Sequence, residues 1–282
     1  MAKQTQTAAR PGAVQSWARR ALEIVWPRNC PFCSCPLADT DPGIVCPDCL
    51  SSAKFIEPPF CRQCASPFTG TVTGETFVCG YCQDLKFYFS RTVAACRAEG
   101  VVRDCILRFK YNREMHFGPH LVNWLLIAAQ RWIDWREIDA IVPVPLHPRK
   151  QRHREFNQAE YLAAGVSRAL RNPETVAAGF SLRTLKGATT EPSSLASFDI
   201  PVVKRNLRRV KDTSTQTKLD AESRMKNLRG AFAVRDETVF NGKRLVLLDD
   251  VFTTGATMDS CAKVLKSAGA REVIALAVAR GV

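Results

Sequence analysis

The sequence predicts an α/β protein in which a mostly parallel sheet is flanked by helices and preceded by a small cysteine-rich domain. Two short apolar runs, 138–146 and 245–248, are typical of strands that are buried on both faces of a parallel sheet. Segments with helical spacing of apolar residues lie around these runs. Four closely spaced CxxC pairs between residues 30 and 82 mark the smaller domain that precedes them.

The segment 245–269 is predicted to form a buried strand, a loop and a helix in succession. The strand is the apolar run that ends at Leu248, and two carboxylates, Asp249 and Asp250, follow it. Apolar residues at helical spacing then predict a helix at 258–268. Carboxylates directly after a strand of an open α/β sheet lie where such folds bind their ligands.

The loop between this strand and its helix consists of small and hydroxyl-bearing residues: Thr253, Thr254, Gly255, Ala256 and Thr257. Glycine lets the backbone approach a ligand closely, and hydroxyls with free N–H groups at a helix start suit a phosphate. A small-residue turn alone is a weak signal, because many ordinary turns share it. The acid pair beside it makes the pattern more specific and predicts a ligand that carries a phosphate together with hydroxyls or a metal.

The four CxxC pairs predict two consecutive zinc ribbons. Two pairs complete a closed site of four thiolates with no open coordination position, so the zinc ions are expected to be structural. Too few apolar residues accompany the pairs to build a core, and bound metal is therefore expected to supply much of the folding free energy. The eight predicted ligands are Cys30, Cys33, Cys46, Cys49, Cys61, Cys64, Cys79 and Cys82.

Three other uses compete with zinc for these cysteines. A reducing compartment disfavours disulfides, and four spaced pairs are more than a redox dithiol requires. An iron–sulfur cluster stays open as an alternative, because it also takes four thiolates. Cys35 lies beside the first pair as a further candidate ligand, whereas Cys96, Cys105 and Cys261 are expected to be small buried side chains.

Residues 87–170 are expected to supply the first strands and helices of the sheet domain. The patterns predict a strand at 91–98, helices at 101–111 and 121–133, the buried strand at 138–146, and a helix that opens at 156–160 and runs to about 170. The basic end of the 101–111 helix, with Arg108 and Lys110, faces either an anion or solvent.

Basic residues crowd the loop predicted after the strand at 138–146. His147, Arg149, Lys150 and Arg152 lie there in one short run. A basic loop at the carboxyl end of a sheet strand is well placed to meet a pyrophosphate group. Contact with nucleic acid, or with solvent only, is the alternative; pyrophosphate is favoured because the acid pair belongs to the same predicted sheet.

These patterns divide the chain into three parts. A polar tail with a short amphipathic helix occupies 1–29, the two ribbons occupy 30–86, and the sheet domain occupies 87–282. Within the last part, residues 172–200 are rich in Gly, Ser, Thr and Pro and are expected to form a flexible insertion.

The end of the sheet domain is expected to contain a second basic cluster and two regular elements. The cluster occupies 204–211, a helix is predicted at 219–228, and a final apolar strand is predicted at 272–280. No pattern in the sequence predicts an oligomeric state.

Composition is ordinary for a globular protein, with 46% hydrophobic and 24% charged residues, but the net charge of +13 is high. That charge favours binding to a polyanion: nucleic acid, a pyrophosphate ligand or a membrane surface. The most apolar helical segment is too short to span a bilayer, and no apolar block has the length of a signal peptide. We therefore expect a cytoplasmic protein without a membrane span.

Taken in order, these blocks resemble the ComF family of competence-type, GntX-like homologues of amidophosphoribosyltransferases. The resemblance rests on the paired CxxC ribbons and on VPVPLHPRKQRHREFNQAE, RRVKDTSTQTKLDAESRMKNLRGAF and LVLLDDVFTTGATMDSCAKVLKSAGA. It implies a double zinc ribbon followed by a type I phosphoribosyltransferase domain, which binds phosphoribosyl pyrophosphate (PRPP) with Mg²⁺. It also implies a connection with DNA uptake or with purine-like phosphoribosyl chemistry.

The resemblance assigns roles to the predicted site residues. Asp249 and Asp250 would hold the ribose hydroxyls, the loop 253–257 would hold the 5-phosphate, and the basic run at 147–152 would contact pyrophosphate. A mobile loop within 212–228 would close over the ligand and exclude water. No set of residues indicates which acceptor receives the phosphoribosyl group.

The chain departs from the family pattern at a few positions. Glu155 stands where such chains usually have glycine, Ser214 and Thr215 stand where proline is frequent, and the insertion at 172–200 is longer than usual. These departures put loop closure and the choice of acceptor in doubt, while the PRPP motif itself is intact.

Two functions from different classes fit these features. One is a phosphoribosyltransferase that binds PRPP and transfers its phosphoribosyl group to an unidentified acceptor. The other is a non-catalytic accessory protein that binds single-stranded DNA, or the DNA-uptake machinery, through the ribbons and the basic clusters. The acid pair favours the first, because a protein that only binds DNA gains nothing from two carboxylates beside a phosphate loop.

Overall fold

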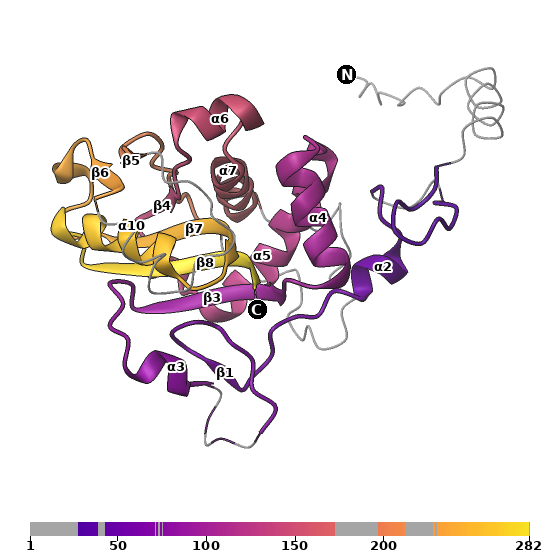
Figure 1. Ribbon diagram of the computed structural model, residues 1–282, viewed down its shortest axis with the longest axis horizontal. Coiled ribbons are helices and arrows are strands. Elements are labelled where there is room, and N and C mark those ends of the chain that lie inside the picture. The colour runs from indigo at the N-terminus through magenta and orange to yellow at the C-terminus, as the bar shows by residue number, and fades with distance from the viewer. Residues whose placement is uncertain are drawn as a thin grey trace, which may run out of the picture. The chain divides into compact units, whose positions relative to one another are not determined.

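The computed structural model describes residues 28–38, 43–70, 72, 74, 76–172, 197–211, 228 and 230–281 (Figure 1). The chain divides into two compact units, residues 1–50 and residues 51–282, and each is described by itself. The predicted helix within 1–29, the mobile loop within 212–228 and nearly all of the predicted insertion lie outside the described residues.

The first unit is built around the first two CxxC pairs. Asn29 and Pro36 form an antiparallel bridge that closes the turn carrying the first pair. Helix α2 (Pro47–Ser51) begins directly after Cys46, so the second pair spans the start of a helix. The buried apolar residues described here are few, chiefly Val45 and Leu50, which agrees with a fold that depends on metal.

A four-stranded parallel sheet in the order β3-β8-β7-β4 forms the centre of the second unit. Its strands are β3 (Arg91–Arg97), β4 (Ala140–Pro143), β7 (Arg244–Phe252) and β8 (Glu272–Arg280). All four are buried along most of their length, as strands covered on both faces must be. The predicted parallel sheet is confirmed.

Helices cover both faces of this sheet. Helices α5 and α7 pack against one face and against each other, and α10 lies on the other face (Figure 1). Helix α4 packs against α5 and β3. The bounds are α4 (Gly100–Tyr111), α5 (Gly118–Trp132), α7 (Gln158–Arg171) and α10 (Ala256–Ser267).

The segment after β4 differs from the prediction, because residues 148–154 form helix α6 (Pro148–Arg154) where a loop was expected. Pro148 at the first helical position and the His147 side chain, which accepts a hydrogen bond from the Arg149 N–H at 3.4 Å, start the helix. Arginine, lysine and glutamine are good helix formers, so a basic run is compatible with a helix. Glu155 ends α6 with φ of 67°, in the left-handed region.

That conformation is one that glycine would adopt more readily than glutamate. Glycine adopts positive φ without the steric penalty that a side chain brings. The Glu155 carboxylate lies 2.8 Å from the guanidinium of Arg113, but both side chains are exposed and such a pair contributes little.

The second basic cluster also has a structure that the sequence analysis does not predict. Strand β5 (Leu207–Arg209) pairs with β6 (Phe232–Val234) in an antiparallel ribbon. Short 3-10 helices connect other elements: η1 (Met115–Phe117), η2 (Trp135–Glu137) and η5 (Glu237–Val239).

The second pair of CxxC motifs lies within the second unit. Strands β1 (Phe60–Cys61) and β2 (Thr76–Phe77) pair in parallel, and helix α3 (Gly80–Gln83) carries the last cysteine. Backbone hydrogen bonds join the segment 54–63 to β3, and a small apolar cluster lies beneath it. The predicted domain boundary between residues 86 and 87 stays a prediction.

Candidate ligand site and metal centres

The carboxyl ends of β4 and β7 form the point where the chain switches sides of the sheet. The chain leaves β4 toward α7 on one face, and it leaves β7 toward α10 on the other face. Adjacent parallel strands whose connections diverge in this way leave a crevice at their carboxyl ends, where open α/β sheets bind ligands. In the register of the two strands, Pro143 of β4 pairs with Leu248 of β7.

The acid pair therefore begins one residue beyond the last paired position of β4. The predicted strand ends at Leu248, but β7 continues through both carboxylates to Phe252 and stays paired with β8. Because consecutive strand residues point to opposite faces, Asp249 and Asp250 have different surroundings. Asp249 accepts a hydrogen bond from the Asp250 backbone N–H at 2.9 Å.

Asp250 is only 5% exposed and has a cationic partner. The ammonium Nζ of Lys110, at the carboxyl end of α4, lies 2.9 Å from its Oδ1 and 2.8 Å from its Oδ2. Such a buried charge pair offsets the desolvation of both groups only when the geometry is good, as it is here.

Burial and the neighbouring Asp250 charge raise the pKa of Asp249 to about 7, while Lys110 and Arg209 act in the opposite direction. Asp249 keeps part of its surface accessible to solvent, so a ligand can reach it. Near neutral pH this carboxyl group is close to its midpoint of ionisation.

The predicted phosphate loop connects β7 to α10. Thr253 and Thr254 follow the strand, Gly255 is the N-cap of α10, and Ala256 and Thr257 belong to its first turn. The Thr254 hydroxyl accepts a hydrogen bond from the Ala256 N–H at 3.4 Å. Backbone N–H groups at a helix start and threonine hydroxyls are suitable donors for a phosphate.

Gly255 is required here for a reason that the sequence analysis does not identify. Its φ is +79°, and a Cβ atom added to it would lie 2.6 Å from the ring of Phe252. Any side chain at this position would therefore strain the backbone and displace a buried aromatic residue.

A cleft of about 630 Å³ opens beside the crevice, at the carboxyl end of β4. Helix α6 lines one side and the β5–β6 ribbon lines another. The lining includes His147 and four arginines from the ribbon and its flanks: Arg205, Arg208, Arg209 and Arg235.

Only one member of the predicted pyrophosphate group, His147, is among the residues that line this cleft. Arg149 and Arg152 lie on the exposed surface of α6. Lys150 is also in α6, but its side chain is outside the described set. The cleft arginines and Lys110 were not predicted as site residues. The sequence features that could have indicated them are the basic cluster at 204–211 and the basic end of the α4 helix.

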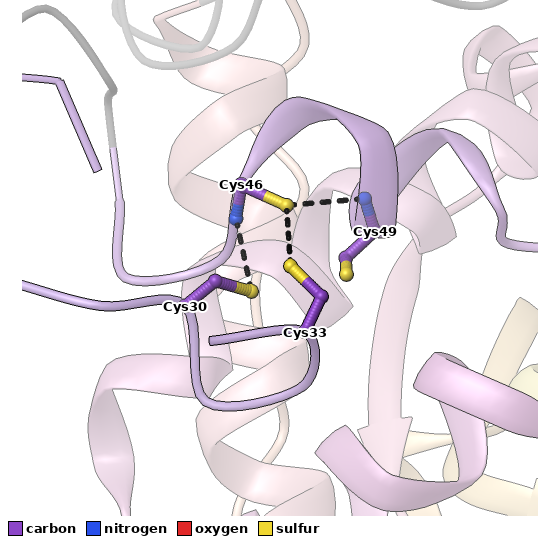
Figure 2. Close-up of side chains that lie close together, drawn as sticks. All are labelled: Cys30, Cys33, Cys46 and Cys49. Carbon is purple, nitrogen blue, oxygen red and sulfur yellow. Dashed lines mark hydrogen bonds between the residues drawn. The ribbon is translucent and has the colours of Figure 1, made fainter. Parts of the chain in front are cut away.

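The first metal centre gathers the sulfur atoms of Cys30, Cys33, Cys46 and Cys49 within 4.8 Å of one another. Figure 2 shows the four side chains converging from one turn and from the start of helix α2, and the Sγ atoms of Cys33 and Cys46 are 3.5 Å apart. Backbone N–H groups donate to the sulfurs, from Cys46 to Cys30 at 3.5 Å and from Cys49 to Cys46 at 3.4 Å.

A fifth sulfur lies beside this centre. Cys33 Sγ is 3.3 Å from Cys35 Sγ, so Cys35 is adjacent to the four predicted ligands. The four CxxC cysteines alone complete the group whose sulfurs are mutually close.

The second metal centre gathers Cys61, Cys64, Cys79 and Cys82 in the same way. The Sγ atoms of Cys64 and Cys79 are 3.8 Å apart, and the Cys79 N–H donates to Cys61 Sγ at 3.3 Å. The hydrogen bond from Cys64 lowers the pKa of Cys61 to about 4. A thiolate is therefore favoured at this position before any metal binds.

Both centres fit one zinc ion each. Tetrahedral zinc with Zn–S bonds of about 2.3 Å requires sulfurs roughly 3.8 Å apart, close to the distances observed. An iron–sulfur cluster, with several irons and bridging sulfides, would hold its four thiolates farther apart. No disulfide links the described cysteines.

None of the helices in the described part of the chain has the length and apolar character needed to cross a membrane.

Comparison with family models matches residues 21–85 to a double zinc ribbon domain and residues 161–281 to a phosphoribosyl transferase domain.

Curated relatives cover most of the chain. The chain is 28% identical to competence protein F of Haemophilus influenzae, over 84% of this chain and 90% of the relative. It is 30% identical to the DNA utilization protein YhgH of Escherichia coli, over 88% of this chain and 94% of the relative.

One solved structure that matches part of the chain is the glutamine PRPP amidotransferase of B. subtilis complexed with ADP and GMP. The match has a TM-score of 0.35 and 18% identity, and it covers 61% of this chain and 30% of that chain. The relatives, the two matched domains and their order lead to one assignment: the chain belongs to the ComF family, with a double zinc ribbon followed by a phosphoribosyl transferase domain.

Proposed function

We propose that this protein binds PRPP with Mg²⁺ at the crevice between β4 and β7 and transfers the phosphoribosyl group to an acceptor, as a cytoplasmic component of DNA uptake or use. One observation carries the proposal: an acid pair and a small-residue loop at a helix start share the carboxyl end of β7 at the switch point of the sheet. Competence and DNA utilization are the words in the names of the relatives.

Each part of the crevice has a suitable role in this reaction. The ribose hydroxyls donate hydrogen bonds to Asp249 and Asp250, whose negative charge favours positive charge developing at the anomeric carbon. The loop 253–257 binds the 5-phosphate, and this binding away from the reacting bond fixes the position of the ribose. His147 and the cleft arginines offset negative charge on the departing pyrophosphate.

The residues present fit a magnesium ion that is held mainly by the ligand. Lys110 contacts both oxygens of Asp250, and Mg²⁺ commonly keeps several waters and binds through substrate phosphates. When bound, the ion would neutralise part of the negative charge of the pyrophosphate group.

Isothermal titration calorimetry with PRPP and Mg²⁺ tests the binding step. At pH 8, above the pKa of about 7, Asp249 is mostly ionised and wild-type protein is expected to bind in the micromolar range. Asp249→Asn removes one charged acceptor and should weaken binding about tenfold or more. A positive result justifies a screen of acceptors with release of pyrophosphate as the readout.

Asp139→Asn is the matched control. Asp139 lies just before β4, at the amino ends of the strands and away from the crevice, where its carboxylate accepts a hydrogen bond from the Arg244 N–H at 2.7 Å. The control should bind PRPP like the wild type. Absence of binding by the wild type, or equal weakening by both variants, counts against the proposed site.

A second candidate function, binding of single-stranded nucleic acid without catalysis, is favoured by the arginines on the β5–β6 ribbon. Arg205, Arg208 and Arg235 are exposed and line one cleft, an arrangement that suits a phosphate backbone. If this function holds, Arg208→Gln and Arg235→Gln together should weaken a salt-dependent mobility shift of single-stranded DNA. Protein that shifts DNA but binds no PRPP would favour this function over phosphoribosyl transfer.

A further inference from the structure

Lys110 is the described cation in closest contact with the acid pair. It comes from the last turn of α4, far from β7 in sequence, and Phe109 and Ile106 of the same turn and the turn before are buried. Its side chain is 20% exposed, and that of Asp250 is 7% exposed. The contact is therefore at the base of the proposed site and shielded from most solvent.

Lys110 does not use all the lone pairs of the Asp250 carboxylate. An ionised carboxylate has about four lone-pair positions, two on each oxygen. The Lys110 ammonium lies 2.9 Å from Oδ1 and 2.8 Å from Oδ2 and therefore uses one position on each. Lys110 leaves one position on each oxygen unused, and two neighbouring ribose hydroxyls would supply two donors.

Two adjacent carboxylates in a buried place would otherwise share a proton. Mutual repulsion and desolvation both favour the neutral acid. Burial and then the Asp250 charge raise the pKa of Asp249, and Lys110 opposes this shift. Burial acts to lower the pKa of Lys110, but the charges of Asp250 and Asp249 outweigh it and raise the pKa, so the ammonium stays protonated.

Other charged or titratable groups face this pair from the surrounding elements. Arg154 of α6 repels the Lys110 charge, Arg209 of β5 attracts Asp249, and Cys261 of α10 is a buried thiol near Asp249. The ion pair of Asp250 in the described structure is with Lys110, at 2.8 Å.

We propose that Lys110 is a positioning residue of the phosphoribosyl site: its ion pair holds the Asp250 carboxylate in one orientation for the ribose hydroxyls. The inference rests on the proposed function. The ligand then meets an acceptor that is already oriented, so binding requires no rotation of the carboxylate.

The test compares full-length wild type with Lys110→Met and Lys110→Arg by calorimetry of PRPP with Mg²⁺, from pH 6 to pH 9. Lys110→Met keeps the length of the side chain without its charge. We expect it to weaken binding about tenfold or more at pH 7 and to recover part of the affinity as the pH rises, because the acid pair then loses its shared proton. Lys110→Arg should keep the wild-type pH profile.

Arg103→Met is the matched control. Arg103 is on the same helix, its side chain is 63% exposed, and its substitution also replaces a cation by methionine. It should leave affinity and pH profile unchanged. If Lys110→Met unfolds by circular dichroism, Lys110→Gln replaces it, because the amide donates to Asp250 without a charge. A wild-type affinity and pH profile in the neutral variant would overturn the proposal.

Carbon-13 NMR titration of the Asp249 carboxyl group separates this inference from the proposed function, because it needs no ligand. The Lys110 charge lowers the pKa of Asp249, so we expect a higher pKa for Asp249 in Lys110→Met than in the wild type. If wild-type protein binds no PRPP, the proposed function fails and the ligand-positioning role fails with it. An unchanged Asp249 titration overturns the role of Lys110 even where PRPP binds.

Discussion

The two metal centres have the same ligands and the same spacing within each pair, but their surroundings differ. The first, with Cys30 and Cys46, belongs to a small unit with few buried apolar residues. The second, with Cys61 and Cys64, belongs to the unit that contains the parallel sheet. One motif therefore serves as a self-contained fold in one place and as part of a larger fold in the other.

Hydrogen bonds make the second ribbon an extension of the sheet. The Ile56 N–H donates to Ala95 O at 2.9 Å, and the Thr92 N–H donates to Arg62 O at 2.9 Å. Strand β3 is at the edge of the sheet, and the ribbon pairs with backbone groups that would otherwise be open. The comparison teaches that zinc in the second ribbon is expected to stabilise the sheet, whereas zinc in the first is not.

Substitution of a zinc-binding cysteine is expected to give the largest difference in stability between the two centres. Cys64→Ser should lower the free energy of unfolding of the sheet unit by at least about 5 kcal/mol, because structural zinc contributes roughly 10–16 kcal/mol in isolated zinc fingers. Cys30→Ser should leave the same urea transition unchanged, with tryptophan fluorescence as the probe. Equal losses in the two variants would contradict the comparison.

The apolar contact beneath the second ribbon should give the next largest effect. Phe60 is 6% exposed and packs edge-to-face against Trp132, with ring centroids 5.0 Å apart. Phe60→Ala should therefore destabilise the sheet unit by about 3–5 kcal/mol in urea unfolding. Phe68, on the same ribbon but 44% exposed, is the control, and its substitution by alanine should have a clearly smaller effect.

A single hydrogen bond between ribbon and sheet should give a smaller effect. The Thr92 hydroxyl donates to Gln63 O at 2.6 Å, and Thr92 is 1% exposed. Thr92→Val keeps the shape but leaves this carbonyl without its donor, which should lower the free energy of unfolding by about 1 kcal/mol. Amide hydrogen exchange in the ribbon should quicken at the same time; a stabilised variant would argue that the bond is not needed for docking.

The smallest effect on the free energy of unfolding is expected from an exposed ion pair between the second ribbon and α5. Arg131 Nη1 lies 2.6 Å from Glu57 Oε2, but the side chains are 48% and 64% exposed. Glu57→Gln should change the free energy of unfolding by about 0.2–1 kcal/mol, and less at high salt. A loss comparable to that of Phe60→Ala would mean that charge, rather than apolar contact, holds the ribbon to the sheet.

Features with a local, periodic signal were predictable from the sequence. Strand β8 occupies the predicted residues 272–280, and the helices that pack on the sheet lie within a few residues of their predictions. Strand β7 runs past its predicted end because Asp249 and Asp250 resemble loop residues, although pairing with β8 keeps them extended. The zinc ligands were predictable because each CxxC pair contains its own spacing.

Contacts between distant segments were not predictable in this way. The approach of Lys110 to Asp250 depends on how α4 crosses the sheet, and no local pattern encodes that crossing. The same is true of the hydrogen bond from Thr92 to Gln63, which joins a strand to a ribbon. The site thus combines a loop that is visible in the sequence with partners that only the fold supplies.

The place of β8 in the sheet has a consequence for synthesis of the protein. Strand β8 lies between β3 and β7, yet it follows both of them in the chain. When β3 and β7 have emerged from the ribosome, they still cannot pair with each other. The edge of each strand that pairs with β8 in the folded sheet stays unpaired until β8 has been synthesised. The second ribbon, which emerges just before β3, can already cover the outer edge of that strand. Zinc captured early on the ribosome would thus leave β3 with one open edge instead of two during the interval in which aggregation is most probable.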